Sequence, residues 1–581
     1  MHVSTHRRHY TGKDGVARTY ETQLLRRSFR EDGKVKNETV ANLSHLPAET
    51  IELIRRSLAG QLLVPALAAA TVTRALPHGH VAAVHAQAKA LGLPALLGPA
   101  GRSRDLALAL IISRVIRPGT KLATATWWAE TTLGADLGVA EASTDEVYAA
   151  MDWLFKRQDA IEATLAARHL APEVNPSRMA LFDLTSAWME GRHCPPAARG
   201  YSRDGKKNRA QIEYGLLTDP AGRPVAVRVF AGNTADPTAF IDAVSIVRDK
   251  FGLTDLVMVG DRGMITSARI AALAQDTDLG WLTALRAPQV AKLAADDGPL
   301  QLSLFDEFDL AEISHPDYPG ERLIACRNPA LAAERARKRL DLLAATQTAL
   351  APILAAVEAG RLSGASRIGL KLGRILNKYK MAKHLHLTIT DTSLTVTRRP
   401  DQIEAEAALD GIYVLRTNVP ATDLDAPGMV TADKNLANVE RDFRSIKVDD
   451  LKLRPIHHRL ADRVRAHVLI AMLAAYLIFH LRRAWAPLTF TDQAPPDRDN
   501  PVAPATRSDT ATRKASRQRD DDGQPVRSFQ GVLDHLATLT RNDIRYHTTD
   551  QTPVVPSLAL PTPTQRRAFE LLDQPIPNQL K

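Results

Sequence analysis

The segment Met179-Ala-Leu-Phe-Asp-Leu-Thr-Ser-Ala187 decides the fold, because a single acid, Asp183, stands at the end of a short apolar run. A second segment, Leu256-Val-Met-Val-Gly-Asp-Arg-Gly263, ends in the same way at Asp261. Apolar runs of this length are typical of buried strands, and the edge of such a run can present a carboxylate. Both segments therefore predict strands that carry a functional acid.

A third acid lies in a charged segment of helical character, Val439-Glu-Arg-Asp-Phe-Arg-Ser-Ile-Lys447. Glu440, Arg444 and Lys447 are spaced i, i+4 and i+7, which places them on one face of a helix. On that face one carboxylate can hold a metal while two cations reach phosphate. An exposed helix with ordinary i,i+4 ion pairs has the same spacing, and the pattern alone leaves both interpretations open.

The residues around the first two acids alternate between strand and helix patterns, which indicates an α/β core. The expected order is three strands, a helix and a fourth strand, at residues 179–184, 211–217, 225–230, 238–251 and 256–260. In a ribonuclease-H-like sheet, strands one and four of this order lie side by side. That arrangement would bring Asp183 and Asp261 within reach of one pair of metal ions.

The remaining sequence divides by composition into further regions. The helix-rich region at 47–175 is consistent with a bundle that binds DNA and equally with a purely structural bundle. The expected domains are a small basic β-rich module (1–46), a helical and DNA-binding region (47–175), the first part of the core (176–288), an inserted domain (289–409), the second part of the core with C-terminal helices (410–490), and a disordered linker and tail (491–581).

The composition describes a protein of several domains that attracts polyanions. The chain has 581 residues and a formal net charge of +10, with 45% hydrophobic and 24% charged residues. A basic surface favours nucleic acid as partner, because each neutralised phosphate releases counterions. The two cysteines lie far apart, which excludes a disulfide framework and a thiolate zinc site. The longest apolar run, residues 468–479, is too short to span a membrane and predicts a buried helix. We therefore expect a cytoplasmic protein that does not bind membranes.

The three acids suit phosphodiester chemistry with hard divalent ions. Carboxylate oxygens are the ligands that Mg²⁺ and Mn²⁺ prefer, and two such ions can act on both sides of a phosphorus atom. The loop Gly200-Tyr-Ser-Arg-Asp-Gly-Lys-Lys-Asn-Arg-Ala-Gln211 is basic. Its Arg203, Lys206 and Lys207 can contact phosphates, although an ordinary solvated loop has the same composition.

Together these segments resemble the DDE transposases of bacterial insertion sequences, in the subgroup with a Tyr-x2-Arg-x3-Glu-x6-Lys signature. Asp183, Asp261 and Glu440 match the three acids of the family, and Lys447 matches the signature Lys. The loop at 200–206 and Gly232-Asn-Thr-Ala-Asp236 are similar to other family segments. The chain departs from the signature where Asp433 takes the Tyr place and Leu436 the Arg place.

The resemblance implies cut-and-paste transposition by a ribonuclease-H-like core that an inserted domain interrupts. Asp183, Asp261 and Glu440 would bind two Mg²⁺ ions, or Mn²⁺ in their place, while Arg444 and Lys447 position DNA. The implied partners are terminal inverted repeats, target DNA and a second copy of the chain, in a nucleoid-associated homodimer. Two alternatives remain: a nuclease of the same fold that cleaves without joining, and a non-catalytic DNA-binding descendant.

Overall fold

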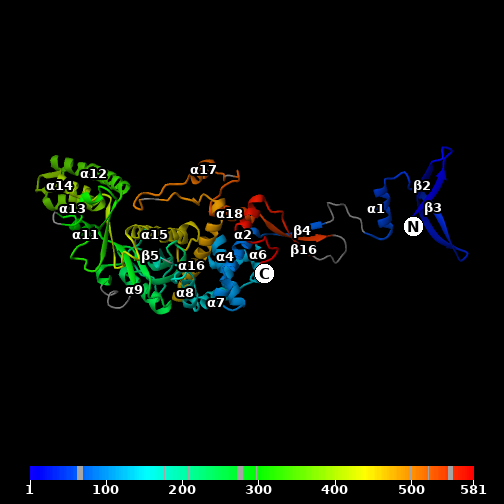
Figure 1. Cartoon of the computed structure of the whole chain (residues 1–581), viewed down its shortest axis with the longest axis horizontal. Helices are drawn as coiled ribbons and strands as arrows, with labels where there is room; N and C mark the ends of the chain where they lie inside the picture. Colours follow the sequence, from blue (N-terminus) through cyan, green and yellow to red (C-terminus); the bar gives the residue numbers. More distant parts are fainter. Residues whose placement is uncertain are drawn as a thin grey trace. The chain divides into compact units, whose positions relative to one another are not determined.

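The chain forms two compact units that are discontinuous in sequence (Figure 1). The first unit is Met1–Pro77 with Leu539–Pro561, and the second is His78–Thr538 with Thr562–Lys581. The computed structural model describes residues 1–61, 70–175, 177–206, 208–270, 279–295, 298–497, 500–520, 522–546 and 554–580.

The first unit contains two three-stranded antiparallel sheets. One has the order β1-β2-β3, and the helix α1 lies alongside it (Figure 1). Gly15 and Gly33, at the two turns, have φ of 76° and 74°, a conformation that glycine adopts without strain. The other sheet has the order β16-β15-β4. The elements are β1 (His2–Thr11), β2 (Ala17–Glu31), β3 (Lys34–Asn42), α1 (Ala48–Leu58), β4 (Ala70–Pro77), β15 (Thr540–Tyr546) and β16 (Val554–Leu558).

The structure does not support a domain boundary at residue 46, and the region expected to be helical from residue 47 does not begin there. Helix α1 belongs with the N-terminal sheet, because Arg55 donates hydrogen bonds to Thr5 and Gln23. Residues 70–77 form the strand β4, which pairs with the distant β15. Local composition does not reveal a strand whose partner lies more than 460 residues away.

Helices of the second unit begin at residue 79, and α4 and α16 lie at the centre of its helical part. Ser143 and Glu146 cap α7 reciprocally. Helices α7 and α8 are separated by the short break at Lys156 and Arg157. The helices are α2 (Gly79–Ala90), α3 (Leu93–Leu97), α4 (Arg102–Ile116), α5 (Lys121–Trp128), α6 (Thr132–Leu137), α7 (Thr144–Phe155) and α8 (Gln158–His169).

A mixed sheet of eight strands forms the α/β part, with the order β10-β11-β14-β9-β8-β5-β6-β7. Strands β5, β8 and β9 are parallel neighbours, and β6 and β7 continue antiparallel from β5. The predicted adjacency of the first and fourth strands is confirmed. The strands are β5 (Met179–Trp188), β6 (Gln211–Thr218), β7 (Pro224–Ala231), β8 (Val257–Gly260), β9 (Gly280–Ala284), β10 (Leu310–Ile313), β11 (Arg322–Arg327) and β14 (Ile412–Thr417).

Helices α9 (Asp236–Ser245), α15 (Ala426–Arg444) and α16 (Ala461–Ala484) pack against the sheet. The apolar run at 468–479 lies within α16 and is almost entirely buried, as expected. By length and composition alone, α16 and the 30-residue α12 (Pro329–Glu358) reach the threshold for a membrane span. Burial of 83% of the apolar window of α16 marks that helix as a core element.

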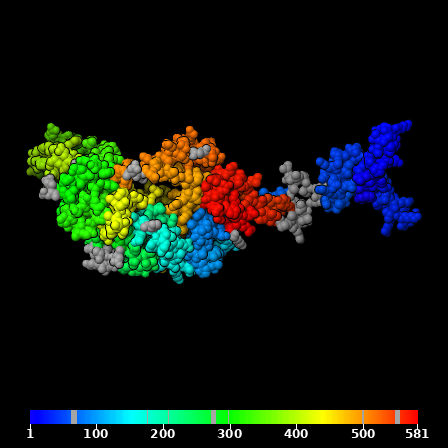
Figure 2. Space-filling view, viewed as in Figure 1, coloured from blue at the N-terminus to red at the C-terminus, as the bar shows by residue number. Residues whose placement is uncertain are grey.

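The segment expected as an inserted domain, 289–409, is divided between two structures. Strands β10 and β11 extend the main sheet through β14, so this part is not separate from the core. The rest packs around a core of its own, which includes Leu343 and Leu372. Its yellow-green residues gather at one end of the second unit (Figure 2). Its elements after α12 are α13 (Ala365–Tyr379), β12 (Leu385–Ile389), β13 (Leu394–Arg398) and α14 (Pro400–Ala407), and α11 (Ala287–Leu293) precedes β10.

The prediction of a disordered linker and tail over 491–581 is wrong where the chain forms helices and strands, between residues 509 and 570. Helices α18 (Phe529–Ala537) and α19 (Pro563–Glu570) bury Leu533 and Phe569 in the main core. Helix α17 (Asp509–Arg517) precedes them. The Pro- and Asp-rich composition hid two short amphipathic helices, which pack against α2 and Trp485.

Candidate active site

The sheet places Asp183, in the middle of β5, next to Asp261, which directly follows the end of β8. Strands β5 and β8 run parallel, and Phe182 is paired with Gly260. Asp183 and Asp261 each follow that pair by one residue. They therefore lie at the same level of the sheet, on adjacent strands.

Asp183 carries the electrostatic signature of an acidic cluster. Its Oδ1 accepts a hydrogen bond from the Leu184 amide at 2.7 Å. Burial raises the pKa of Asp183 to about 7, the Leu184 amide opposes that shift, and the charge of Asp261 reinforces it. Arg203 lowers the same pKa and Glu440 raises it. The negative charges of Asp261 and Glu440 therefore both reach Asp183.

Asp261 is exposed and occupies the turn that follows β8. Its Oδ1 accepts a hydrogen bond from the Arg262 amide at 2.8 Å. A methyl group at Gly263 would lie 3.6 Å from Oδ2 of Asp261 and 3.8 Å from Oδ2 of Asp236. Asp236, at the start of α9, is thus a neighbouring acid whose role the sequence did not reveal.

Glu440 comes from α15, which packs against β5 and β8. Its side chain is exposed, and Asp433 lies two turns earlier on the same helical face. Burial raises the pKa of Asp433 to about 6, and the charge of Asp261 adds to the shift. The departure from the family signature at this position therefore adds an acid beside Asp261.

The acids do not close into a compact ligand set. Within the described residues, no group of three His, Cys, Asp or Glu side chains converges as a set of metal ligands. The acids that act on Asp183 are close enough to perturb its protonation. Small movements of exposed side chains such as Asp261 and Glu440 would be needed to complete a metal site.

Arg203 lies inside the cluster. Its guanidinium donates to Oδ1 of Asp236 at 2.5 Å, and its Nη1 lies 3.6 Å from Oε2 of Glu213. Burial raises the pKa of the Glu213 carboxyl to about 7, although Arg203 opposes that shift. The Arg203 amide also bonds to Ser186 on β5 at 3.1 Å, which ties the basic loop to the sheet. Arg203 is therefore placed to organise acids beside Asp183.

The other cations expected to contact DNA occupy different environments. Arg444 is exposed and has no ion pair within the described residues. The Lys206 ammonium lies 5.8 Å from the centroid of the Trp188 ring. Lys447 is 9% exposed, and its Nζ lies 3.0 Å from Oδ1 of Asp204. Lys207 lies outside the described residues.

Lys447 lines a basic cavity that the sequence did not predict. The cavity has a volume of about 410 Å³ and lies beside the C-terminal end of β5. Arg454 also pairs with Asp204, whose side chain is only 2% exposed. The lining residues are Trp188, Asp204, Lys206, Lys447, Val448, Lys452 and Arg454.

Comparison with known families identifies the family of the chain. The model of the transposase DDE domain matches residues 180–478, which is more than half of the chain, and the chain therefore belongs to the DDE transposases. The model of the N-terminal domain of IS1634 family transposases matches residues 9–64, which places the chain among the transposases of insertion sequences. No curated protein matches the chain. Membership implies DNA as the partner class, and divalent metal ions are general to the family.

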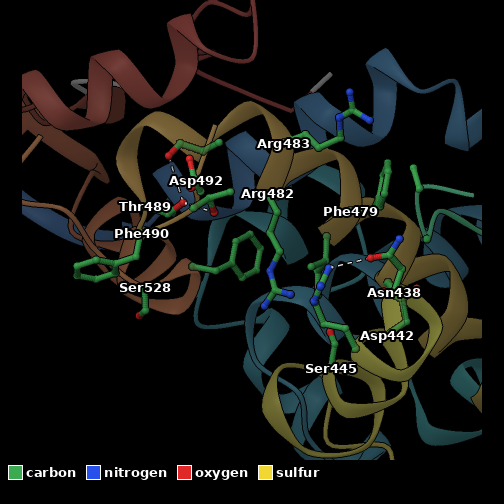
Figure 3. Close-up of a pocket in the computed structure, with 18 of the residues that line it drawn as sticks. Asn438, Asp442, Ser445, Phe479, Arg482, Arg483, Thr489, Phe490, Asp492 and Ser528 are labelled. Atoms are coloured by element: carbon green, nitrogen blue, oxygen red, sulfur yellow. Dashed lines mark hydrogen bonds between the residues drawn. The ribbon is translucent and has the colours of Figure 1, made fainter. Parts of the chain in front are cut away.

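A larger cavity lies on the opposite face of α15. It has a volume of about 820 Å³. Figure 3 shows Asn438 and Asp442 of α15, and Ser445 directly after that helix, facing Phe479 and Arg482 of α16. Asp442 is two residues from Glu440, about 200° around the helix. The cavity is therefore separate from the acidic cluster, and its depth reflects packing between α15, α16 and the segment before α18.

Replacing Asp442 with Asn is expected to stabilise the protein at alkaline pH. Burial raises the pKa of Asp442 to about 8, Arg441 and Arg482 oppose that shift, and Asp219 adds to it. Its Oδ2 is buried without a hydrogen-bond partner. Between about pH 4 and pH 8 the folded chain holds a proton that the unfolded chain has lost, so stability falls as pH rises. Because Asn carries no charge at any pH, the variant avoids this loss of about 2 kcal/mol in the free energy of unfolding.

The measurement is the melting temperature of wild type and Asp442→Asn between pH 5 and pH 9. The Asn variant should melt a few degrees higher at pH 8.5, and the difference should shrink towards pH 5. The exposed Asp449→Asn removes the same charge and should show no such trend. An Asp442→Asn protein that is less stable than wild type at pH 8.5 would contradict the assignment.

Proposed function

We propose that the protein moves its own insertion sequence by binding the terminal inverted repeats, cleaving the element's ends by hydrolysis and joining them to target DNA. The observation that carries this proposal is the cluster of Asp183, Asp261 and Glu440. Asp183 lies on β5 and Asp261 directly follows the neighbouring parallel strand β8, just beyond the point where the two strands stop pairing. Glu440 comes from a helix packed on those strands, and the charges of Asp261 and Glu440 both perturb Asp183. A chain of this family needs such a cluster for chemistry at phosphorus.

The order of the strands supports a ribonuclease-H-like core as the frame of the site. Strands β7-β6-β5-β8-β9 are consecutive in the sheet, with β7, β6 and β5 antiparallel and β5, β8 and β9 parallel. Between β9 and α15 the chain adds β10, β11 and β14 to the sheet and carries the α12–α14 segment. We propose that this segment is the functional insertion of the core, within the expected 289–409.

The acids of the cluster fit Mg²⁺, with Mn²⁺ as a substitute. Their oxygens are hard ligands, and burial and mutual repulsion leave Asp183 with an unfavourable negative charge that cations would offset. Asp183, Asp261 and Glu440 would hold two such ions, which when bound supply an activated oxygen nucleophile and a stabilised leaving oxygen. Arg203 would keep Asp236 and Glu213 from competing for the same cations.

The chain's cations would hold the DNA strand at the cluster. Exposed Arg444 lies one turn beyond Glu440 and is free to contact phosphate. Lys206, beside Trp188, and its sequence neighbour Lys207 would contact the same backbone. Lys447, which is paired with buried Asp204, would support the cavity beside β5. We further propose that two copies of the chain bridge the two ends of the element in the bacterial cytoplasm, associated with the nucleoid.

The test is cleavage of DNA that carries the regions flanking the gene. Wild type should release the element's end only when Mg²⁺ or Mn²⁺ is added, and should join that end to a second plasmid. Cleavage without joining would make the protein a nuclease. Binding without cleavage would make it a DNA-binding descendant, and either result would refute the proposed function.

A further inference from the structure

The N-terminal sheet has two faces, and α1 covers only one of them. Side chains alternate between the faces of a strand, so odd- and even-numbered residues of β1 and of β2 point in opposite directions. Arg55 of α1 donates to Oγ1 of Thr5 at 2.6 Å and to Oε1 of Gln23 at 2.8 Å. Thr5 and Gln23 are paired across β1 and β2. The helix therefore lies on the odd-numbered face.

The uncovered side, which we name the even face, is formed by the even-numbered residues of β1 and β2. No acid is among them, whereas Glu21, Glu31 and Glu38, the acids of the three strands, belong to the other face. There the pairs Arg7–Glu21 and Lys36–Glu31 offset charge. The even face consists of His2, Ser4, His6, Arg8, Tyr10, Arg18, Tyr20, Thr22, Leu24, Arg26, Ser28 and Arg30.

Arginines and tyrosines alternate across the centre of the even face. Arg8 is paired with Tyr20, and Tyr10 is paired with Arg18. Tyr10 and Tyr20 are 54% and 55% exposed, although large aromatic side chains usually find cover. Arg18 pairs with Asp14 of the turn, but an exposed pair of this kind contributes little and is readily exchanged for phosphate. Guanidinium and phenol groups are donors for phosphate oxygens.

The dimensions of this surface match duplex DNA. The ten residues of β1 span about 33 Å, close to one turn of the double helix. A two-stranded ribbon fits the width of the major groove. The turn between the strands, Gly12-Lys13-Asp14-Gly15, adds one more cation at its tip.

We propose that the even face of β1 and β2 is a docking surface for duplex DNA, and that it holds the ends of the element during transposition. The inference rests on the proposed function for the identity of that DNA. It assigns DNA recognition to the N-terminal sheet, whereas composition had assigned it to the helical region. The two faces of one sheet also provide a matched control.

The experiment measures binding of fluorescent duplex DNA to the full-length chain over a range of salt concentrations. One variant changes Arg8, Arg18 and Arg30 to Gln on the even face. The control changes Arg7, Arg27 and Lys34 to Gln on the odd face and removes the same charge. Loss of three phosphate contacts should flatten the slope of log affinity against log salt by about 2.7 and weaken binding at least about tenfold near 0.1 M salt. The control should bind within about threefold of wild type.

Equal losses in both variants, or no loss in the even-face variant, would overturn the inference. Tighter binding to a double-stranded RNA of equal length, or to anionic vesicles, would overturn it as well. The single variant Arg8→Gln, with an expected loss of slope of about 0.9, serves if the triple variant folds poorly. Wild-type cleavage of the flanking DNA is scored alongside. If wild type cleaves the flanking DNA while the even-face variant binds DNA normally, only this inference fails. If wild type does not cleave but the even-face variant loses DNA binding as expected, only the proposed function fails.

Discussion

Asp183→Asn and Asp261→Asn are each expected to abolish DNA cleavage while leaving DNA binding intact or stronger. Asn keeps the shape of the side chain but withdraws the charge that would hold a divalent ion beside the scissile phosphate. Metal ions supply several kcal/mol of transition-state stabilisation, so the loss of rate should be about a thousandfold or more. Binding survives because the substitution removes a negative charge that faces an anionic backbone.

The measurement pairs end cleavage in Mg²⁺ with binding of the same DNA in EDTA. Asp242→Asn is the matched control, since Asp242 is exposed on α9 and lies outside the acidic cluster. The control should cleave as wild type does. If Asp183→Asn lost binding and cleavage together, the acid would support the fold, and its assignment to catalysis would fail.

Asp204→Asn is expected to destabilise the second unit by about 3 kcal/mol. The Asp204 side chain is 2% exposed and pairs with both Lys447 and Arg454. Burial lowers the pKa of Lys447, and Asp204 opposes that shift. Removing the one acid leaves two cations together in a confined basic cavity, and breaking a buried pair from one side is costly.

Thermal and urea unfolding of wild type, Asp204→Asn, Lys447→Met and the double variant measure this effect. The double variant should recover part of the loss, with a coupling energy of about 1 kcal/mol or more. If Asp204→Asn were as stable as wild type and bound DNA more tightly, the assignment of Asp204 to a stabilising buried pair would be wrong. In that case Asp204 would only shield Lys447 until phosphate displaces it.

The sheet could be predicted from sequence where the signal was local. The apolar runs around Asp183 and Asp261 are short, and their lengths and turns identify β5 to β8 and their order. The pairing of β4 with β15 had no local signal, because each strand depends on a partner hundreds of residues away. Helices α18 and α19 were missed since a few apolar residues, such as Phe529 and Phe569, were outweighed by polar neighbours.

The acids of the candidate site were visible in the sequence, but their surroundings were not. Asp183 and Asp261 were predicted from the ends of two short apolar runs, and Glu440 was predicted from a helical pattern that includes two cations. Arg203, Asp236 and Glu213 come from a loop, a helix and a strand. Their spacing in the sequence does not predict that these three side chains lie close together. The burial of Lys447 against Asp204 likewise depends on tertiary packing, which turns an expected surface cation into a buried one.

The most direct test of the central claim compares wild type with Glu440→Gln on DNA that carries the gene's flanks, and scores end release and joining to a second plasmid in Mg²⁺. Wild type should release and join the ends, and Glu440→Gln should do neither although it binds the DNA equally well. Wild type that binds the flanks but cleaves in neither Mg²⁺ nor Mn²⁺ would contradict the account and leave Asp183, Asp261 and Glu440 without a catalytic role.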